Sequence, residues 1–128
     1  MEYRLNGYTI LIVDDDLDIL ESIELAIRAE GAKTLMANNG TDAVKENKIA
    51  KPDAIILDMM LPKRSGFLVI EEIMKSKKTP VIVMLTANQG KRHMAYAKSL
   101  GVSEYFYKPI GLDRLIDRIS NLLSERIK

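Results

Sequence analysis

Short apolar runs alternate with longer segments of mixed polarity along the whole chain. Five of the runs are predicted to be strands, and the most apolar are typical of strands buried on both faces of a parallel sheet. The central one should end at Asp58, because Pro62 soon afterwards forbids continued ladder pairing. The five predicted strands cover residues 9–13, 33–37, 54–58, 81–85 and 104–107.

Between these runs, apolar residues recur at the spacing of one helix face. The stripe after residue 112 is the clearest, whereas the segment 91–100 is poorly amphipathic. Either Asn39 or Thr41 could cap the second helix. Strands alternating with helices predict a doubly wound α/β fold, a parallel sheet with helices on both faces. The predicted helices cover residues 19–27, 42–50, 67–74, 91–100 and 112–123.

Composition narrows the class of protein. At 128 residues and 47% hydrophobic content, a single domain spanning 1–128 is expected. The net charge of +1 favours neither nucleic acid nor an anionic membrane surface, and the absence of cysteine excludes disulfides and zinc-thiolate sites. No apolar run approaches the ~20 residues that span a bilayer, so a cytoplasmic protein without membrane insertion is expected.

Four of the predicted strands deliver polar side chains at the same end. Because the carboxyl ends of parallel strands share one edge, these groups can converge, and that edge is where open α/β sheets bind ligands. Convergence from four strands is more specific than any one of the motifs alone. The residues are Asp14, Asp15 and Asp16 after the first strand, Asp58 after the third, Thr86 after the fourth and Lys108 after the fifth.

This set of groups suits phosphoryl transfer. Clustered carboxylates repel one another unless a counter-charge is present, and Mg²⁺ takes one or two carboxylates together with phosphate and water. Lys108 adds a positive charge and Thr86 a hydroxyl, which suit the oxygens of a phosphoryl group. A carboxylate can itself be the nucleophile, and Asp58, alone at the centre of the group, is the candidate.

The same pieces resemble a known family. The chain is similar to bacterial two-component response-regulator receiver domains, including those of chemotaxis regulators. The resemblance implies a flavodoxin-like sheet of strand order 2-1-3-4-5. The matching motifs, in order, are Leu11-Ile12-Val13-Asp14-Asp15-Asp16, Leu57-Asp58-Met59-Met60-Leu61-Pro62, Gly66, Leu85-Thr86-Ala87 and Tyr105-Phe106-Tyr107-Lys108-Pro109.

The resemblance also implies a role for each site residue. Asp58 resembles the phosphoacceptor, and Thr86 with Lys108 resembles the pair that holds the phosphoryl oxygens. Tyr105 resembles the switch aromatic that turns inward when the threonine moves. The implied Mg²⁺ ligands are Asp14, Asp15, Asp58 and the backbone carbonyl of Met60, with Asp14 acting through water.

The implied function is a signalling switch rather than an enzyme acting on other molecules. A sensor histidine kinase or histidine phosphotransfer protein would supply the phosphoryl group, and a downstream target or output domain would receive the signal. A monomer or a weak phosphorylation-dependent dimer is expected. Water attacking the aspartyl phosphate would pass between Met60 and Asn88, the residues two beyond the acceptor and two beyond the threonine.

Two departures from the family pattern stand out. The loop after Pro62 carries Ser65-Gly66 where Asp-Gly is usual. The acidic pair and glutamate of the winged-helix dimer mode are replaced by Ser103-Glu104 and Arg114.

The residues argue against four other functions. A flavin carrier would need a Gly/Ser/Thr-rich phosphate loop, and a dinucleotide enzyme a Gly-x-Gly-x-x-Gly turn, and neither is present. A carboxylate-nucleophile phosphatase would carry the pattern Asp-x-Asp-x-Thr directly after the first strand, and this pattern is not present. A receiver that acts by protein contact alone is the remaining alternative, and the complete acceptor set argues against it.

Overall fold

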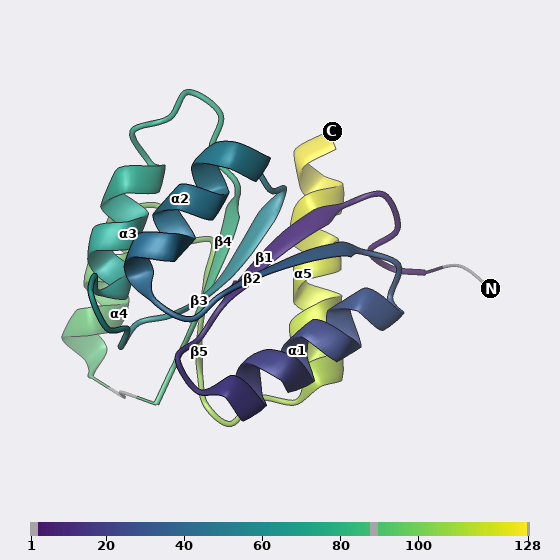
Figure 1. The fold of residues 1–128 in the computed structure, drawn as a ribbon, viewed down its shortest axis with the longest axis horizontal. Coiled ribbons are helices and arrows are strands. Elements are labelled where there is room, and N and C mark those ends of the chain that lie inside the picture. The colour runs from purple at the N-terminus through teal and green to yellow at the C-terminus, as the bar shows by residue number, and fades with distance from the viewer. Residues whose placement is uncertain (1–2, 88–89, 128) are drawn as a thin grey trace.

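A computed structural model, which describes residues 3–87 and 90–127, shows a five-stranded sheet covered by helices on both faces (Figure 1). The strands are β1 (Thr9–Val13), β2 (Lys33–Ala37), β3 (Ala54–Asp58), β4 (Val81–Thr86) and β5 (Glu104–Tyr107). The helices are α1 (Leu17–Ala29), α2 (Gly40–Ala50), α3 (Gly66–Ile73), α4 (Lys91–Ser99) and α5 (Leu112–Ile127). The predicted order of alternating strands and helices is confirmed.

The sheet is entirely parallel, in the order β2-β1-β3-β4-β5. The predicted doubly wound fold and its strand order are therefore confirmed. The register pairs Asp58 with Leu85 and Thr86 with Tyr107, so the residues that follow these strands meet at one edge. Within the described residues, no helix combines the length and the apolar character needed to cross a bilayer.

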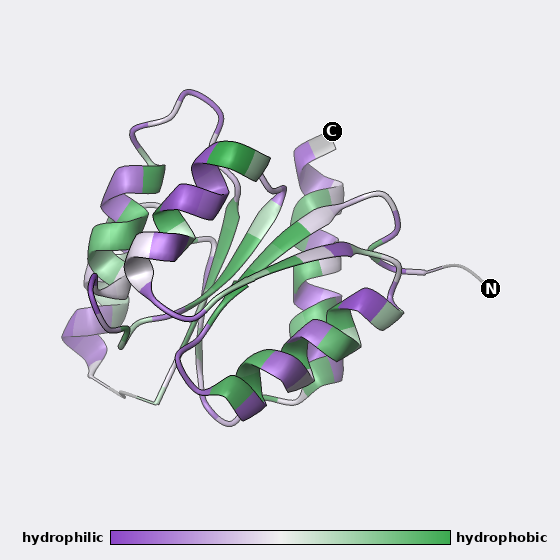
Figure 2. Ribbon diagram, viewed as in Figure 1, coloured by the Kyte–Doolittle hydropathy of each residue, from purple (hydrophilic) through white to green (hydrophobic). Residues whose placement is uncertain are grey.

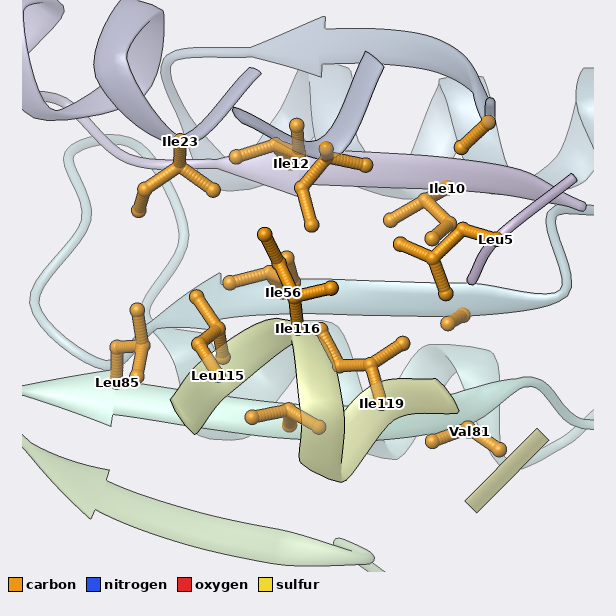
Figure 3. Packing of buried hydrophobic residues seen from close by; sticks show 14 of the residues in the cluster. Leu5, Ile10, Ile12, Ile23, Ile56, Val81, Leu85, Leu115, Ile116 and Ile119 are labelled. Atoms are coloured by element: carbon orange, nitrogen blue, oxygen red, sulfur yellow. The ribbon is translucent and has the colours of Figure 1, made fainter. Parts of the chain in front are cut away.

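Alternate residues of each central strand belong to two separate cores, as the period of two requires. Ile12 and Ile56 point towards α1 and α5, whereas Leu11 and Leu57 point towards α2, α3 and α4. Figure 3 shows the first core, where Leu115, Ile116 and Ile119 of α5 lie over the sheet. Strands buried on both faces explain their uninterrupted apolar runs, which Figure 2 shows as green ribbons.

The start of α2 differs from the sequence expectation by two residues. The helix α2 begins at Gly40 rather than Asp42, and Asn39 is its cap, since its side chain accepts from the amide of Asp42. Gly40 is required because a Cβ there would overlap the backbone carbonyl of Arg64. Thr41, the alternative cap, lies inside the helix.

The atypical Ser65-Gly66 loop forms the start of α3. The Ser65 hydroxyl accepts from the amide of Leu68 at 3.4 Å and so caps the helix. A Cβ on Gly66 would lie 2.8 Å from the carbonyl oxygen of Asp58, which leaves no room for any other residue. Serine therefore supplies the helix cap, and the glycine allows the close approach to the end of β3.

Candidate functional site

The three consecutive aspartates after β1 take three different environments. Asp14 is buried, and its carboxylate accepts from the amide of Asp16 at 2.9 Å. Asp15 is exposed at the mouth of the site. Asp16 caps α1, because its carboxylate accepts from the amides of Asp18 and Ile19. The tripeptide thus divides into two candidate ligands and one helix cap.

The carboxylates that follow β1 and β3 come together as expected. Oxygens of Asp14, Asp15 and Asp58 all lie within 4.8 Å of one another. Asp58 is 6% exposed, and one of its oxygens accepts from the amide of Met60 at 3.3 Å. Because Asp15 beside it is exposed, a cation or a substrate can approach this cluster from solvent.

Lys108 supplies the positive charge inside this group. Its Nζ lies 2.7 Å from Oδ2 of Asp14 and 3.5 Å from Oδ2 of Asp58. Its backbone amide donates to the carbonyl of Thr86 at 2.8 Å, which anchors the end of β5 to β4. Thr86 is fully buried at the end of β4, next to the residue that pairs with Asp58. All four strand ends singled out in the sequence therefore contribute to one edge.

The pKa values of Asp58 and Lys108 reflect the close packing of these charged groups. Burial raises the pKa of Asp58 above its ordinary value, and Asp14 adds to the rise, while Lys108 partly offsets both. Burial lowers the pKa of Lys108, but its hydrogen bond with Asp14 and the charges of Asp58 and Asp14 outweigh burial, so its pKa is raised. The lysine is held as a cation, and the Asp58 carboxylate is more basic than usual.

Comparison with known proteins identifies the family. The sequence model described as the response regulator receiver domain matches residues 10–120, most of the chain. The chain belongs to this family.

Solved structures of the family share the fold over nearly the whole chain. A receiver domain protein from Methanospirillum hungatei is 25% identical, with a TM-score of 0.88 over 94% of this chain and 95% of its own. One from Clostridium thermocellum is 27% identical, with a TM-score of 0.86 over 93% and 96%. The receiver domain of a Francisella response regulator is 26% identical, with a TM-score of 0.86 over 95% and 100%.

The acidic cluster of this receiver fits a divalent cation. Three carboxylates supply hard oxygen ligands, and only one lysine offsets their charge at close range among the described residues. Asp14, Asp15 and Asp58 are the described side chains whose oxygens could hold such a cation together.

The side chain of Tyr105 is almost completely buried, whereas an aromatic residue in a strand is commonly only half-buried. It is 5% exposed, and its hydroxyl donates to Sδ of Met59 at 3.7 Å. Its ring meets Tyr107 edge to face at 5.7 Å. In this receiver the switch candidate already points inward, and it touches the residue directly after Asp58. Sequence reasoning assigned no site role to Met59, because an apolar residue at a strand end carries no chemical signal.

Of the two residues expected to flank the attacking water, the structure describes one. The side chain of Met60 is 62% exposed beside the site, which leaves it free to cover the approach to Asp58. Asn88 lies outside the described residues.

Proposed function

We propose that this receiver accepts a phosphoryl group on Asp58 in two-component signal transduction. The observation that carries the proposal is the set of distances around one buried carboxylate. Lys108 Nζ lies 3.5 Å from Asp58, and the Asp14 and Asp15 oxygens lie within 4.8 Å of its carboxylate. A carboxylate whose environment holds both a cation and a metal-ligating group is suited to nucleophilic attack on phosphorus.

The proposed donor is the phosphohistidine of a sensor histidine kinase or a histidine phosphotransfer protein. An oxygen of Asp58 attacks the phosphorus, the phosphorus–nitrogen bond breaks, and its electron pair stays on the departing imidazole. The raised pKa of Asp58 makes its carboxylate a better electron-pair donor than an exposed aspartate. The histidine returns to its neutral form by taking a proton from solvent.

Five groups of the receiver, besides Asp58 itself, would hold the transferred phosphoryl oxygens and the cation. Lys108 would turn from Asp14 towards a phosphoryl oxygen, and the Thr86 hydroxyl would approach another. Asp14, Asp15, Asp58 and the carbonyl of Met60 would ligate Mg²⁺, with Asp14 acting through water. The bound cation supplies charge neutralisation for the phosphoryl oxygens.

The new charge would then bias a surface that contacts a protein target or output domain. The segments proposed to carry the signal are α4, β5 and α5. Since Tyr105 already points inward, its proposed part is a change of hydrogen-bond partner. Its bond to the Met59 sulfur is weak and readily exchanged. In this proposal the receiver is a cytoplasmic switch that catalyses only its own phosphorylation and dephosphorylation.

Phosphorylation by acetyl phosphate with Mg²⁺ tests the acceptor. Intact-mass spectrometry should find one added phosphoryl group, and Asp58→Asn should remove it. Asp16→Asn is the matched control, because it changes a neighbouring carboxylate that caps α1 and leaves the cluster intact. Equal labelling of Asp58→Asn, or loss of labelling in Asp16→Asn alone, would reject Asp58 as the acceptor.

A thermal-shift titration tests the metal ligands separately. Mg²⁺ should raise the melting temperature of the native receiver by mass action. Asp15→Asn should need more Mg²⁺ for the same rise, while Asp16→Asn should follow the native curve. An identical titration for Asp15→Asn and the native protein would contradict the ligand role.

A further inference from the structure

A groove crosses the edge of the sheet opposite the carboxylate site. It lies between the C-terminal end of α2, the loop from α3 to β4 and the last turn of α5, with a volume of about 610 Å³. In Figure 1 this loop and the end of α5 lie at the top, and the β1–α1 connection lies at the bottom. A molecule in the groove would leave the Asp58 edge open, because parallel strands begin at one edge and end at the other.

The lining of the groove is strongly basic. Five cations and one carboxylate line it, a formal charge of +4 beside +1 for the whole chain. The four lysines are exposed, and none forms an ion pair with any residue in the described ranges. The cations are Lys48 and Lys51 at the end of α2, Lys77 and Lys78 in the loop, and Arg126 of α5.

The remaining two charged groups hold the groove walls together. Arg126 donates to the carbonyl of Thr79 at 2.6 Å and to that of Asp53 at 3.3 Å, so α5 is fixed to both connecting segments. The Asp53 carboxylate accepts from the amide of Thr9 at 2.8 Å. Only the lysines are therefore left for a partner, and the walls that carry them are held in place.

Between the lysines the groove has an apolar floor. Pro52, Pro80 and Leu123 are buried there, and Tyr8 is half-buried beside them. A floor of this kind can cover one apolar side chain, while the lysines along the rim reach groups on either side of it.

We propose that this groove docks an acidic peptide segment of a protein partner. The apolar side chain of the segment would lie on the floor between the two prolines, and its flanking carboxylates would pair with the four lysines. The groove is open and its cations are on long flexible side chains. A small-molecule site would enclose most of its ligand and fix it with a few preorganised groups. A nucleic-acid strand would need basic groups along a continuous track, whereas these are confined to one groove.

The position of the groove makes this docking independent of phosphorylation. The partner and the phosphoryl donor would use opposite edges of the sheet, so both could be bound at once. Tethering the receiver to a partner in this way would raise its effective concentration near that partner, while α4 and β5, which do not line the groove, stay open.

The test is an NMR titration of the full chain with a blocked peptide of glutamates around one leucine. Amide shifts should concentrate at Lys51, Lys78, Thr79 and Leu123. The double variant Lys77→Glu/Lys78→Glu should weaken binding by about tenfold or more, because two attractive contacts become repulsive. The matched control is Lys45→Glu/Lys98→Glu, which makes the same change of net charge at exposed positions outside the groove.

Four outcomes decide the proposal. Native affinity in the control and in Asp58→Asn, with loss in the groove variant, supports it. Equal weakening in both double variants would reject it, because binding would then follow net charge alone. Tighter binding of an oligothymidine of equal charge at the same amides would assign the groove to nucleic acid. Tighter binding of ATP would assign it to a small anion.

Discussion

Lys108 is the residue on which the balance of charge at the site depends. Its Nζ lies between two carboxylates that are both almost completely buried, Asp14 at 2.7 Å and Asp58 at 3.5 Å. Removing the cation leaves those carboxylates facing each other with no counter-charge close by in the described structure, and uncompensated buried charge is costly.

Lys108→Met should therefore lower the free energy of unfolding by about 3 kcal/mol in metal-free buffer, the lower end of the range for a broken buried pair. Added Mg²⁺ should restore part of the loss. Urea unfolding with and without Mg²⁺ measures both effects. The control Lys45→Met, at an exposed position of α2, should change stability by no more than ~0.5 kcal/mol. Equal stability of the two variants would show that Lys108 contributes nothing to the charge balance.

Met60 should control the lifetime of the phosphorylated state. Its side chain has no useful donor or acceptor and is exposed beside the acceptor, so it should shield the phosphorus from in-line water. The aspartyl phosphate of Met60→Asn should be hydrolysed about tenfold faster, if shielding by Met60 adds ~1.4 kcal/mol to the barrier of that reaction. The measurement is decay of the phosphorylated protein after removal of the donor, at constant Mg²⁺. Decay at the same or a slower rate would exclude shielding.

Among the helices, α4 has the weakest attachment that the structure describes. Only Ala97 of this helix is buried, and its N-terminal residue has no side-chain cap. Figure 2 shows α4 as largely pale and purple, in keeping with the poor amphipathicity of its sequence. Its contacts to α3 run through Phe67, whose ring meets Tyr96 at 5.0 Å, and through the Tyr96 hydroxyl, which donates to Glu71 at 2.8 Å. Few buried contacts make such an element easy to displace.

Thr86→Ala should separate phosphorylation from its effect on α4. Phosphorylation of the native receiver should change amide shifts in β5 and α4, because movement of Thr86 towards Asp58 alters the space around Tyr105. In Thr86→Ala, Asp58 should still be labelled, while the distal shifts shrink by roughly half or more. Thr41→Ala, on the exposed side of α2, should leave them unchanged. Distal shifts of full size in Thr86→Ala would place the coupling elsewhere.

The charged residues that depart from the family's dimer pattern contact neighbouring residues of β5 and α5. Glu104 pairs with Arg118 of the same chain at 2.9 Å. The Arg114 guanidinium lies over the Phe106 ring, 5.1 Å from its centre. Glu104 and Arg114, the charged residues at these positions, therefore both form contacts within the chain.

At the scale of the whole molecule, Arg4 connects segments that are distant in sequence. It pairs with Glu30 after α1 and with Asp113 of α5, each at 2.9 Å. The hydrogen bond from Arg4 lowers the pKa of Glu30 below its ordinary value of 4.5. A carboxyl whose pKa is lower in the folded state stabilises that state above its unfolded pKa, and this gain disappears as pH falls through the folded pKa.

Arg4→Gln should therefore reduce stability near neutral pH. The difference from the native protein should shrink as the pH falls below 4.5 through the lowered pKa of Glu30. Urea unfolding at a series of pH values, in low salt to limit screening, measures it. Arg92→Gln, at an exposed position of α4, is the control and should show no such trend. A constant difference between Arg4→Gln and the native protein would mean that Arg4 acts through packing rather than through charge.

The distribution of charge also belongs to the whole molecule. Aspartates gather at the carboxyl ends of the strands and lysines at the opposite edge, although the chain as a whole carries only +1. Net charge gave no sign of a partner, because the two edges cancel. The separation exists only once α2, the α3–β4 loop and α5 are brought together by folding.

The order of the elements and the acceptor candidates could be predicted from the amino-acid pattern alone. Buried parallel strands must be apolar on both faces, so their runs and the polar residues at their ends stand out in one dimension. Asp14, Asp58, Thr86 and Lys108 could be proposed for one site because parallel strands share an edge. Their distances could not, since these depend on strand register and side-chain packing.

The role of each polar residue follows from the three-dimensional packing. It made Asp16 a helix cap rather than a member of the cluster, and it began α2 at Gly40 because Arg64 leaves no room for a side chain. It buried Tyr105 against Met59. It also created the basic groove, whose lysines come from the end of α2 and from the α3–β4 loop. These features arise from contacts between segments far apart in sequence, and no local pattern of residues records such contacts.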